Sequence, residues 1–261
     1  MFEIITGDAI TELARLRDAG ASFSAVATDP PYCSGGVTIN ERRRSVKRKY
    51  FGNREDDENW RFDCVQFNDT MDAPALYDFT RAWLRVCYDL LLNTGYVFIF
   101  CDWRTIPIFA SCLQGAGLQW LGVIPWNKQN ARPNPGIFTP LCEYVVYGSK
   151  NGKSDKHCKG LITASPPKPD ERVHPTQKPV CAFETLYSIL PDDARAVIDP
   201  FCGSGASGVA ALRRGLDYVG IDVKAEYTNA ALARLDNAQA LQDLSAATRQ
   251  TTLINDLEVI Q

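Results

Sequence analysis

Strand-like apolar runs alternate with amphipathic, helix-like runs along most of this chain, and this alternation restricts the folds that it can adopt. We expect strands at residues 2–8, 23–29, 94–102, 118–126, 141–149, 195–201 and 217–223. We expect helices at residues 9–20, 75–91, 105–117, 178–190, 207–215 and 227–241. Strands separated by helices usually pair in parallel, so this order predicts an α/β fold with a doubly wound, mostly parallel, Rossmann-like sheet. The 261 residues suffice for a single domain spanning 1–261.

Two polar segments interrupt the alternation. Residues 33–69 have no steady apolar period and contain a basic run, followed by the acidic residues 55–58. The basic residues of this run are Arg42, Arg43, Arg44, Lys47, Arg48 and Lys49. Residues 149–173 are polar and rich in proline. We therefore expect both segments to be loops inserted between elements of the sheet.

The composition argues against several classes of protein. A net charge of −3 gives no global attraction for polyanions, so any such binding needs a local basic cluster. The nine cysteines include no C-x-x-C pair, which argues against a disulfide scaffold and against a zinc ribbon, and we predict no metal site. The chain has neither a signal-peptide pattern in its first residues nor an apolar run of roughly 18 residues. We therefore expect a cytoplasmic protein that does not enter a membrane.

Unusual residues stand where two of the predicted strands end. Asp29, Pro30, Pro31 and Tyr32 follow the second strand, and proline stops a strand because it cannot donate to the ladder. Gly203 and Gly205 form a turn between a strand and a helix, without the G-K-[ST] ending of a phosphate loop.

Asp222 ends the strand about 20 residues after the glycine turn, where an acidic side chain can bind ribose hydroxyls. The ends of parallel strands meet at one edge of the sheet, which predicts a nucleoside site there. The spacing alone does not distinguish a dinucleotide from another nucleoside.

Three motifs in this order resemble those of a known family. They are Asp-Pro-Pro-Tyr at 29–32, His-Pro-Thr-Gln-Lys-Pro at 174–179 and Asp-Pro-Phe-Cys-Gly-Ser-Gly at 199–205. Together they resemble the DNA methyltransferases that methylate exocyclic amines with S-adenosylmethionine. Because the tetrapeptide precedes the glycine turn, the order is similar to that of the circularly permuted β group. The resemblance covers nearly the whole chain apart from the two loops and the C-terminal tail.

The resemblance implies a set of residues that bind S-adenosylmethionine. Asp222 would hold the ribose, and Asp199 and Phe201 would flank the methionine and adenosine parts. The resemblance places the adenine beside Asp8, although this residue could equally be the cap of the first helix. The full implied set is Asp8, Ala9, Asp29, Lys178, Pro179, Asp199, Phe201, Gly203, Ser204, Gly205 and Asp222. His174 would pack around the cofactor and not act as a general base.

The tetrapeptide suits methylation of an exocyclic amine, whose lone pair is delocalised into the base. If Asp29 and the carbonyl of Pro30 accept the two amine hydrogens, the nitrogen becomes more tetrahedral and its lone pair can attack the methyl group. Pro30 and Pro31 fix that carbonyl. Tyr32 offers a ring on which a base flipped out of the duplex can stack. These four residues are therefore the predicted catalytic residues.

Double-stranded DNA is the partner that the resemblance implies. The basic run would contact phosphates, and Trp126, Asn127 and Lys128 would line the base pocket or touch the DNA backbone. Alternatively, the basic run is a solvated surface and Trp126 is an ordinary packed side chain. The resemblance assigns target recognition to the short segment 149–173, with help from the DNA-contacting loop 33–69 or from a second subunit.

Several alternatives remain open. Asp29 favours N6 of adenine as the target, because methyltransferases for N4 of cytosine more often begin this tetrapeptide with serine. Methyltransferases for RNA or for protein glutamine usually place the glycine turn first and begin the tetrapeptide with asparagine. A non-catalytic DNA-binding subunit would not need both Asp29 and Tyr32. A homodimer, a separate restriction endonuclease, and an edge strand or interface in the tail 245–261 are all compatible with the sequence.

Overall fold

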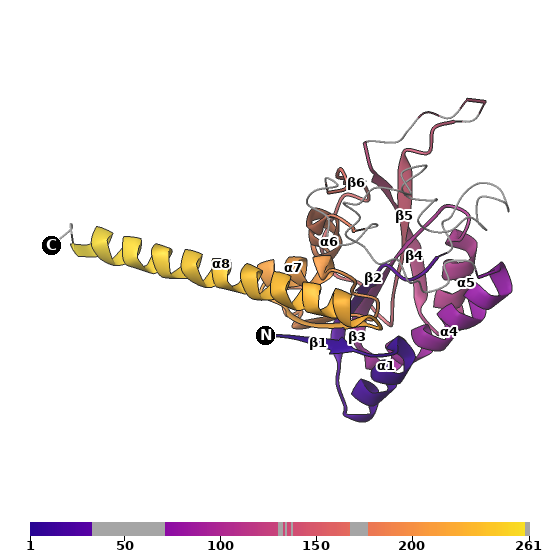
Figure 1. The fold of residues 1–261 in the computed structure, drawn as a ribbon, viewed down its shortest axis with the longest axis horizontal. Coiled ribbons are helices and arrows are strands. Elements are labelled where there is room, and N and C mark those ends of the chain that lie inside the picture. Colours follow the sequence, from indigo (N-terminus) through magenta and orange to yellow (C-terminus); the bar gives the residue numbers. More distant parts are fainter. Residues whose placement is uncertain (33–70, 130–132, 134, 137, 168–176, 259–261) are drawn as a thin grey trace, which may run out of the picture.

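A single eight-stranded sheet with helices on both faces forms the fold (Figure 1). The computed structural model describes residues 1–32, 71–129, 133, 135–136, 138–167 and 177–258, with side chains up to residue 244. The basic run Arg42–Lys49, all of the loop 33–69, and His174 lie outside the described residues.

The strand order in the sheet is β1-β8-β7-β2-β3-β5-β4-β6. The strands are β1 (Phe2–Thr6), β2 (Phe23–Thr28), β3 (Leu91–Cys101), β4 (Gln119–Asn127), β5 (Cys142–Ser149), β6 (Ile162–Thr163), β7 (Ala196–Asp199) and β8 (Asp217–Asp222). The pairs from β1 to β3 and the β4–β6 pair are parallel, whereas β5 runs antiparallel to both β3 and β4. The predicted doubly wound, mostly parallel sheet is therefore confirmed.

Helices cover the two faces of the sheet in two groups. One group packs with one core cluster and comprises α1 (Ala9–Asp18), α4 (Ala73–Leu90) and α5 (Ile106–Gly115). The other packs with the second cluster and comprises α6 (Val180–Tyr187), α7 (Ala206–Arg213) and α8 (Ala225–Glu258). The first turns of α8 pack on α7 and the β1–β8 edge, and the rest of the helix extends away from the body of the protein (Figure 1).

Burial on both faces explains the continuous apolar runs of the central strands. All six residues of β2 are buried, and β3 is buried from Gly95 to Cys101. Phe98 and Phe100 of β3 point into one cluster, while Val97 and Ile99 point into the other. Each such side chain contributes roughly 1.5–3 kcal/mol by burial, so the central strands form a rigid base for the residues at their ends.

Two elements differ from the sequence expectation. Within the segment 149–173, the two-residue strand β6 pairs with the end of β4. Helix α8 continues to Glu258, well past the predicted end at residue 241, so the edge-strand alternative for the tail is wrong.

Among the described residues, no helix combines the length and apolarity that crossing a bilayer requires.

The sheet has its topological switch point between the neighbouring strands β2 and β7. The helix after β2 covers one face, and the helix after β7 covers the other. The two connections therefore diverge and leave space outside the carboxyl ends of these strands, which is where ligands bind in open α/β sheets. Asp29 follows β2 and Asp199 ends β7, so the structure brings both motifs to this position.

Candidate active site

The tetrapeptide 29–32 begins one residue after β2, in a largely buried position. Pro30 and Tyr32 are buried, and the side chain of Asp29 is 20% exposed. Tyr32 packs with the core cluster that contains α4 and α5, so its ring is held by the body of the fold. Asp29 and Tyr32 therefore occupy fixed places at the switch point.

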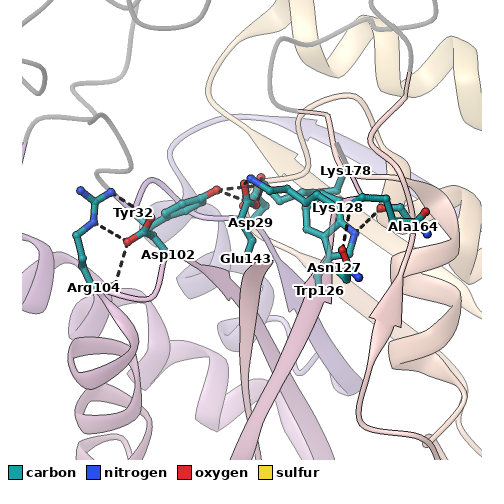
Figure 2. Close-up of polar contacts among 11 residues, drawn as sticks. Asp29, Tyr32, Asp102, Arg104, Trp126, Asn127, Lys128, Glu143, Ala164 and Lys178 are labelled. Carbon is teal, nitrogen blue, oxygen red and sulfur yellow. Dashed lines mark hydrogen bonds and ion pairs between the residues drawn. The ribbon is translucent and has the colours of Figure 1, made fainter. Parts of the chain in front are cut away.

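The ammonium of Lys178 contacts the tetrapeptide (Figure 2). Its Nζ lies 2.6 Å from Oδ2 of Asp29 and donates over 3.3 Å to the hydroxyl of Tyr32. The lysine side chain is only 5% exposed. Its ammonium also lies 5.4–5.9 Å from the ring centroids of Tyr32, Phe100 and Trp126. Rings and carboxylates thus replace the water that a surface ammonium would have.

Glu143 of β5 is a second carboxylate near this ammonium (Figure 2). Its Oε2 is 3.7 Å from Nζ of Lys178 and accepts a 3.4 Å hydrogen bond from the hydroxyl of Tyr32. Its Oε1 accepts a 3.0 Å hydrogen bond from Lys128. Burial raises the pKa of Glu143, but the charges of Lys178 and Lys128 outweigh burial and leave this pKa below its ordinary value. Glu143 is therefore ionised at neutral pH.

The end of β4 forms one wall of the site. Trp126 is buried, and its indole Nε1 donates over 2.8 Å to the carbonyl of Ala164, just after β6. Asn127 turns the chain, because its side-chain oxygen accepts from the backbone N–H of Gln129, which has a left-handed φ of 61°. Trp126 is thus a packed side chain that is also one of the three rings around the ammonium of Lys178.

The carboxyl end of β3 contributes a third pair of charged residues. Arg104 donates to both carboxylate oxygens of Asp102, at 2.7 and 3.0 Å. Figure 2 places this pair on the Tyr32 side of the cluster, away from Lys178. A bidentate pair of this kind holds the turn after β3 in one geometry.

The glycine turn lies beside Asp222 at the end of β8. The backbone N–H of Gly203 donates over 3.0 Å to Oδ2 of Asp222. Gly203 and Gly205 have φ values of 49° and 73°, in the left-handed region that favours glycine. A methyl group built on Gly203 would meet no described atom within 4 Å, whereas one on Gly205 would lie 2.7 Å from Leu235. Gly203 therefore faces open space, and Gly205 allows α7 to pack against α8.

Asp199 is enclosed by protein at the end of β7. It accepts hydrogen bonds from Thr28 at 2.6 Å, from Ser207 at 2.5 Å and from the backbone N–H of Phe201 at 3.0 Å. Burial raises the pKa of Asp199 to about 7, although these hydrogen bonds lower it. Asp199 thus ties β2, the glycine turn and α7 together.

Asp8 lies at the edge strand, away from the tetrapeptide. It caps α1 by accepting a 3.0 Å hydrogen bond from the backbone N–H of Thr11, as the capping alternative predicted, and Ala9 is the first residue of that helix. The backbone N–H of Gly7 donates to the carbonyl of Asp222, so Asp8 and Asp222 end adjacent strands. The structure therefore brings Asp8 close to the glycine-turn side of the edge.

The sequence interpretation missed Glu143, Thr28, Ser207 and the Asp102–Arg104 pair. Glu143 had a usable signal, because it is the one charged residue of the strand Cys142–Ser149. Thr28 and Ser207 are ordinary polar residues next to motifs, and their partner Asp199 is 171 and 8 residues away, respectively. Only the folded chain shows these contacts.

The residues at this edge fit S-adenosylmethionine by their chemistry. Asp222 offers a carboxylate for ribose hydroxyls, and the open face of Gly203 allows close approach to the backbone. Val223, which is 47% exposed beside Asp222, offers an apolar surface for the adenine. Asp29 lies at the neighbouring strand end, and a carboxylate favours a sulfonium cation. Phe201 packs edge-on against Trp83 of α4, with ring centroids 5.5 Å apart.

Comparisons with known proteins agree with this reading. A family model described as DNA methylase matches residues 23–233. The Type II methyltransferase M2.DpnII of Streptococcus pneumoniae is 31% identical over 180 residues, which cover 61% of this chain and 67% of that protein. The crystal structure of an M1.HpyAVI–SAM complex has a TM-score of 0.66 at 23% identity, covering 90% of this chain and 99% of the other. The cytosine-N4-specific PvuII DNA methyltransferase has a TM-score of 0.64 at 17% identity, covering 88% and 85%.

These two solved structures establish a shared fold, and the family model and the sequence relative establish membership. The matched range runs from β2, through the tetrapeptide and the glycine turn, into α8. The chain therefore belongs to the N6/N4 DNA methylase family and is a DNA methyltransferase whose methyl donor is S-adenosylmethionine.

Proposed function

We propose that this enzyme methylates the N6 amine of adenine in double-stranded DNA, on a base flipped out of the duplex. One observation carries the proposal: the Asp29–Tyr32 tetrapeptide lies at the switch point beside the Gly203–Asp222 turn. The amine acceptor and the cofactor residues therefore share one edge of the sheet. The aspartate at the head of the tetrapeptide supports adenine, and N4 of cytosine is the alternative target.

Asp29 and the Pro30 carbonyl would act on the target amine. A carboxylate has about four acceptor positions, so Asp29 can accept an amine hydrogen while its Oδ2 is bound by Lys178. The carbonyl of Pro30 would accept the second hydrogen, and both contacts would direct the nitrogen lone pair away from the base ring. Tyr32 would stack on the base.

S-adenosylmethionine, when bound, supplies an electrophilic methyl group on its sulfonium. The N6 lone pair forms the new N–C bond as the S–C bond breaks, and the amine then loses one proton to Asp29 or to water. Asp29 would stabilise the positive charge that develops on the nitrogen during this step.

The cofactor would lie across the ends of β7 and β8, with Asp222 on the ribose. Gly203, Ser204 and Gly205 would provide the turn, and Asp199 and Phe201 would flank the methionine and adenosine parts. Lys178 and Pro179 would close the pocket, with the ammonium of Lys178 held by Asp29 at its side. Asp8 would reach the adenine from β1.

Target DNA would approach the same edge of the sheet. We assign phosphate contacts to the basic run Arg42–Lys49 and part of the base pocket to Trp126, Asn127 and Lys128. Residues 150–154 lie at the opposite end of β3, since Asn151 bonds Asn93 and Ser154 bonds Tyr96. We therefore assign the recognition role within 149–173 to the part from β6 onward. The proposed partners also include a second copy of the chain, in a homodimer, and a separate restriction endonuclease.

Asp29→Asn tests the assigned chemistry, because it keeps the shape of the side chain and removes its charge. We expect single-turnover methyl transfer to fall at least about 100-fold, as for loss of an electrostatic contact to the reacting group. Binding of S-adenosylmethionine should weaken less than the rate does, because Asp222 and the glycine turn would still hold the rest of the cofactor. Asp192→Asn, at an exposed ion pair with Lys156, is the matched control. Full activity of Asp29→Asn would refute the role of Asp29.

A further inference from the structure

Glu143 is the one charged residue of β5, and it lies beside the proposed catalytic residues. Its side chain is 23% exposed and contacts three polar groups, on Lys178, Lys128 and Tyr32. Two of these three groups also contact each other, because Nζ of Lys178 donates to the hydroxyl of Tyr32. Glu143 thus touches two of the side chains that surround Asp29.

The charges of this cluster balance in pairs. Asp29 and Glu143 supply two carboxylates, and Lys178 and Lys128 supply two ammonium groups. In a poorly hydrated place, removal of one charge leaves its partner uncompensated and shifts the remaining groups. Loss of the Glu143 charge would leave Lys178 drawn more strongly to Asp29 and Lys128 without its partner.

The position of Lys178 decides how strongly Asp29 can accept another hydrogen bond. Nζ is 2.6 Å from Asp29 but 3.7 Å from Glu143. The ammonium of Lys178 therefore interacts more strongly with Asp29 than with Glu143. The carboxylate of Glu143 also attracts this charge. A weaker hold of Lys178 on Asp29 leaves the aspartate a better acceptor for the target amine.

The hydroxyl of Tyr32 contacts the same carboxylate. Its hydroxyl donates to Oε2 of Glu143 at one end of a ring whose face is the proposed stacking surface. The bond is long at 3.4 Å, so it directs the hydroxyl more than it stabilises the protein.

We propose that Glu143 is a positioning residue for methyl transfer, which shares Lys178 with Asp29 and directs the Tyr32 hydroxyl. This inference rests on the proposed function, because it assumes that Asp29 accepts the target amine. It goes beyond that function by adding a residue of β5 that lies outside the three sequence motifs. Glu143 itself is not required to touch the base or the cofactor.

Glu143→Gln is the direct test, because it removes the charge and keeps the side-chain shape. Single-turnover methyl transfer at saturating DNA and cofactor should fall about 10- to 100-fold, the cost of misplacing a catalytic contact by about 1 Å. The Kd for S-adenosylmethionine should change less than about twofold. Glu143→Asp, which restores the charge on a shorter side chain, should recover part of the rate. Glu184→Gln, which removes an ion pair with Arg213 on the surface, should behave like the parent protein.

Each outcome decides the inference. A rate for Glu143→Gln equal to that of Glu184→Gln would overturn it, and so would an equal loss of rate and cofactor affinity. Thermal unfolding of each variant separates a failure to fold from a loss of chemistry, and if Glu143→Gln does not fold, the rate of Glu143→Asp decides. If the parent protein methylates no adenine, the proposed function fails first. If it does and Glu143→Gln is fully active, only this inference fails.

Discussion

Asp199 links the stability of the fold to pH at the scale of one residue. Its carboxyl group is buried among Thr28, Ser207 and the glycine turn, and burial raises its pKa to about 7. In the unfolded chain the same group has a pKa near 3.8. The folded state therefore binds a proton more tightly than the unfolded state over the interval between these values.

This difference in pKa means that Asp199 makes the fold less stable as the pH rises. The contribution of Asp199 to stability is complete below about pH 4 and is lost as the pH rises through about 7. At roughly 1.4 kcal/mol per pKa unit, the loss amounts to at most about 4 kcal/mol.

Asp199→Asn removes this titration. We expect the stability of the variant relative to the parent protein, measured by urea unfolding without cofactor, to increase from pH 5 to pH 8. Parallel pH profiles for the two proteins would show that Asp199 is ionised throughout this range.

The glycine turn shows how one element serves both packing and binding. Gly203 and Gly205 are two residues apart and both have left-handed φ values, yet their surroundings differ. A side chain at 205 would collide with Leu235 and Ala231 of α8, whereas a side chain at 203 would enter open space. A substitution at 205 should therefore mainly lower the stability of the fold, whereas one at 203 should mainly lower the affinity for the cofactor.

Gly205→Ala should lower the free energy of unfolding by about 2–4 kcal/mol, because backbone strain adds to overpacking. Gly203→Ala should cost only about 1–2 kcal/mol from the backbone but should weaken S-adenosylmethionine binding more than tenfold. Chemical denaturation and isothermal titration of both variants provide the measurements. Equal cofactor affinities for the two variants would contradict the assignment of the open face to the cofactor.

Sequence patterns predicted most elements, because the central strands and the helices that cover them have strong periodicity. The direction of β5 was not predictable, since an apolar strand buried on both faces looks alike in either direction. Strand β6 is only two residues long, and it exists because the end of β4 offers it partners. The end of α8 was missed because Ala, Leu, Gln and Asp in its second half give no clear apolar face.

The sequence also predicted some residues of the candidate site but not the contacts between them. Asp29, Tyr32, Asp199 and Asp222 stand at strand ends, where sequence and topology together place them at one edge. The contact between Lys178 and Asp29 joins residues 149 positions apart, and no spacing in the sequence predicts it.

The whole molecule carries a net charge of −3, so its affinity for DNA must come from local basic groups. The basic run Arg42–Lys49 is the densest such group in the sequence, although it lies outside the described residues. Phosphate contacts release counterions, which makes DNA binding fall with salt at a slope of about −0.9 per contact.

Replacement of the six basic residues of this run with serine should reduce the salt slope by roughly 3–5. The affinity for cofactor should not change, because the folded core is untouched. Fluorescence anisotropy of labelled duplex DNA between 50 and 200 mM salt measures the slope. An unchanged slope would make this run a solvated surface and move the phosphate contacts to other residues.

The most direct test of the whole account is the identity of the methylated atom. The protein would be incubated with labelled S-adenosylmethionine and unmethylated duplex DNA, which is then digested to nucleosides and analysed by mass spectrometry. We predict label in N6-methyldeoxyadenosine and none in N4-methyldeoxycytidine. Label in N4-methyldeoxycytidine alone, or no label in DNA while the cofactor is bound, would contradict the proposed function.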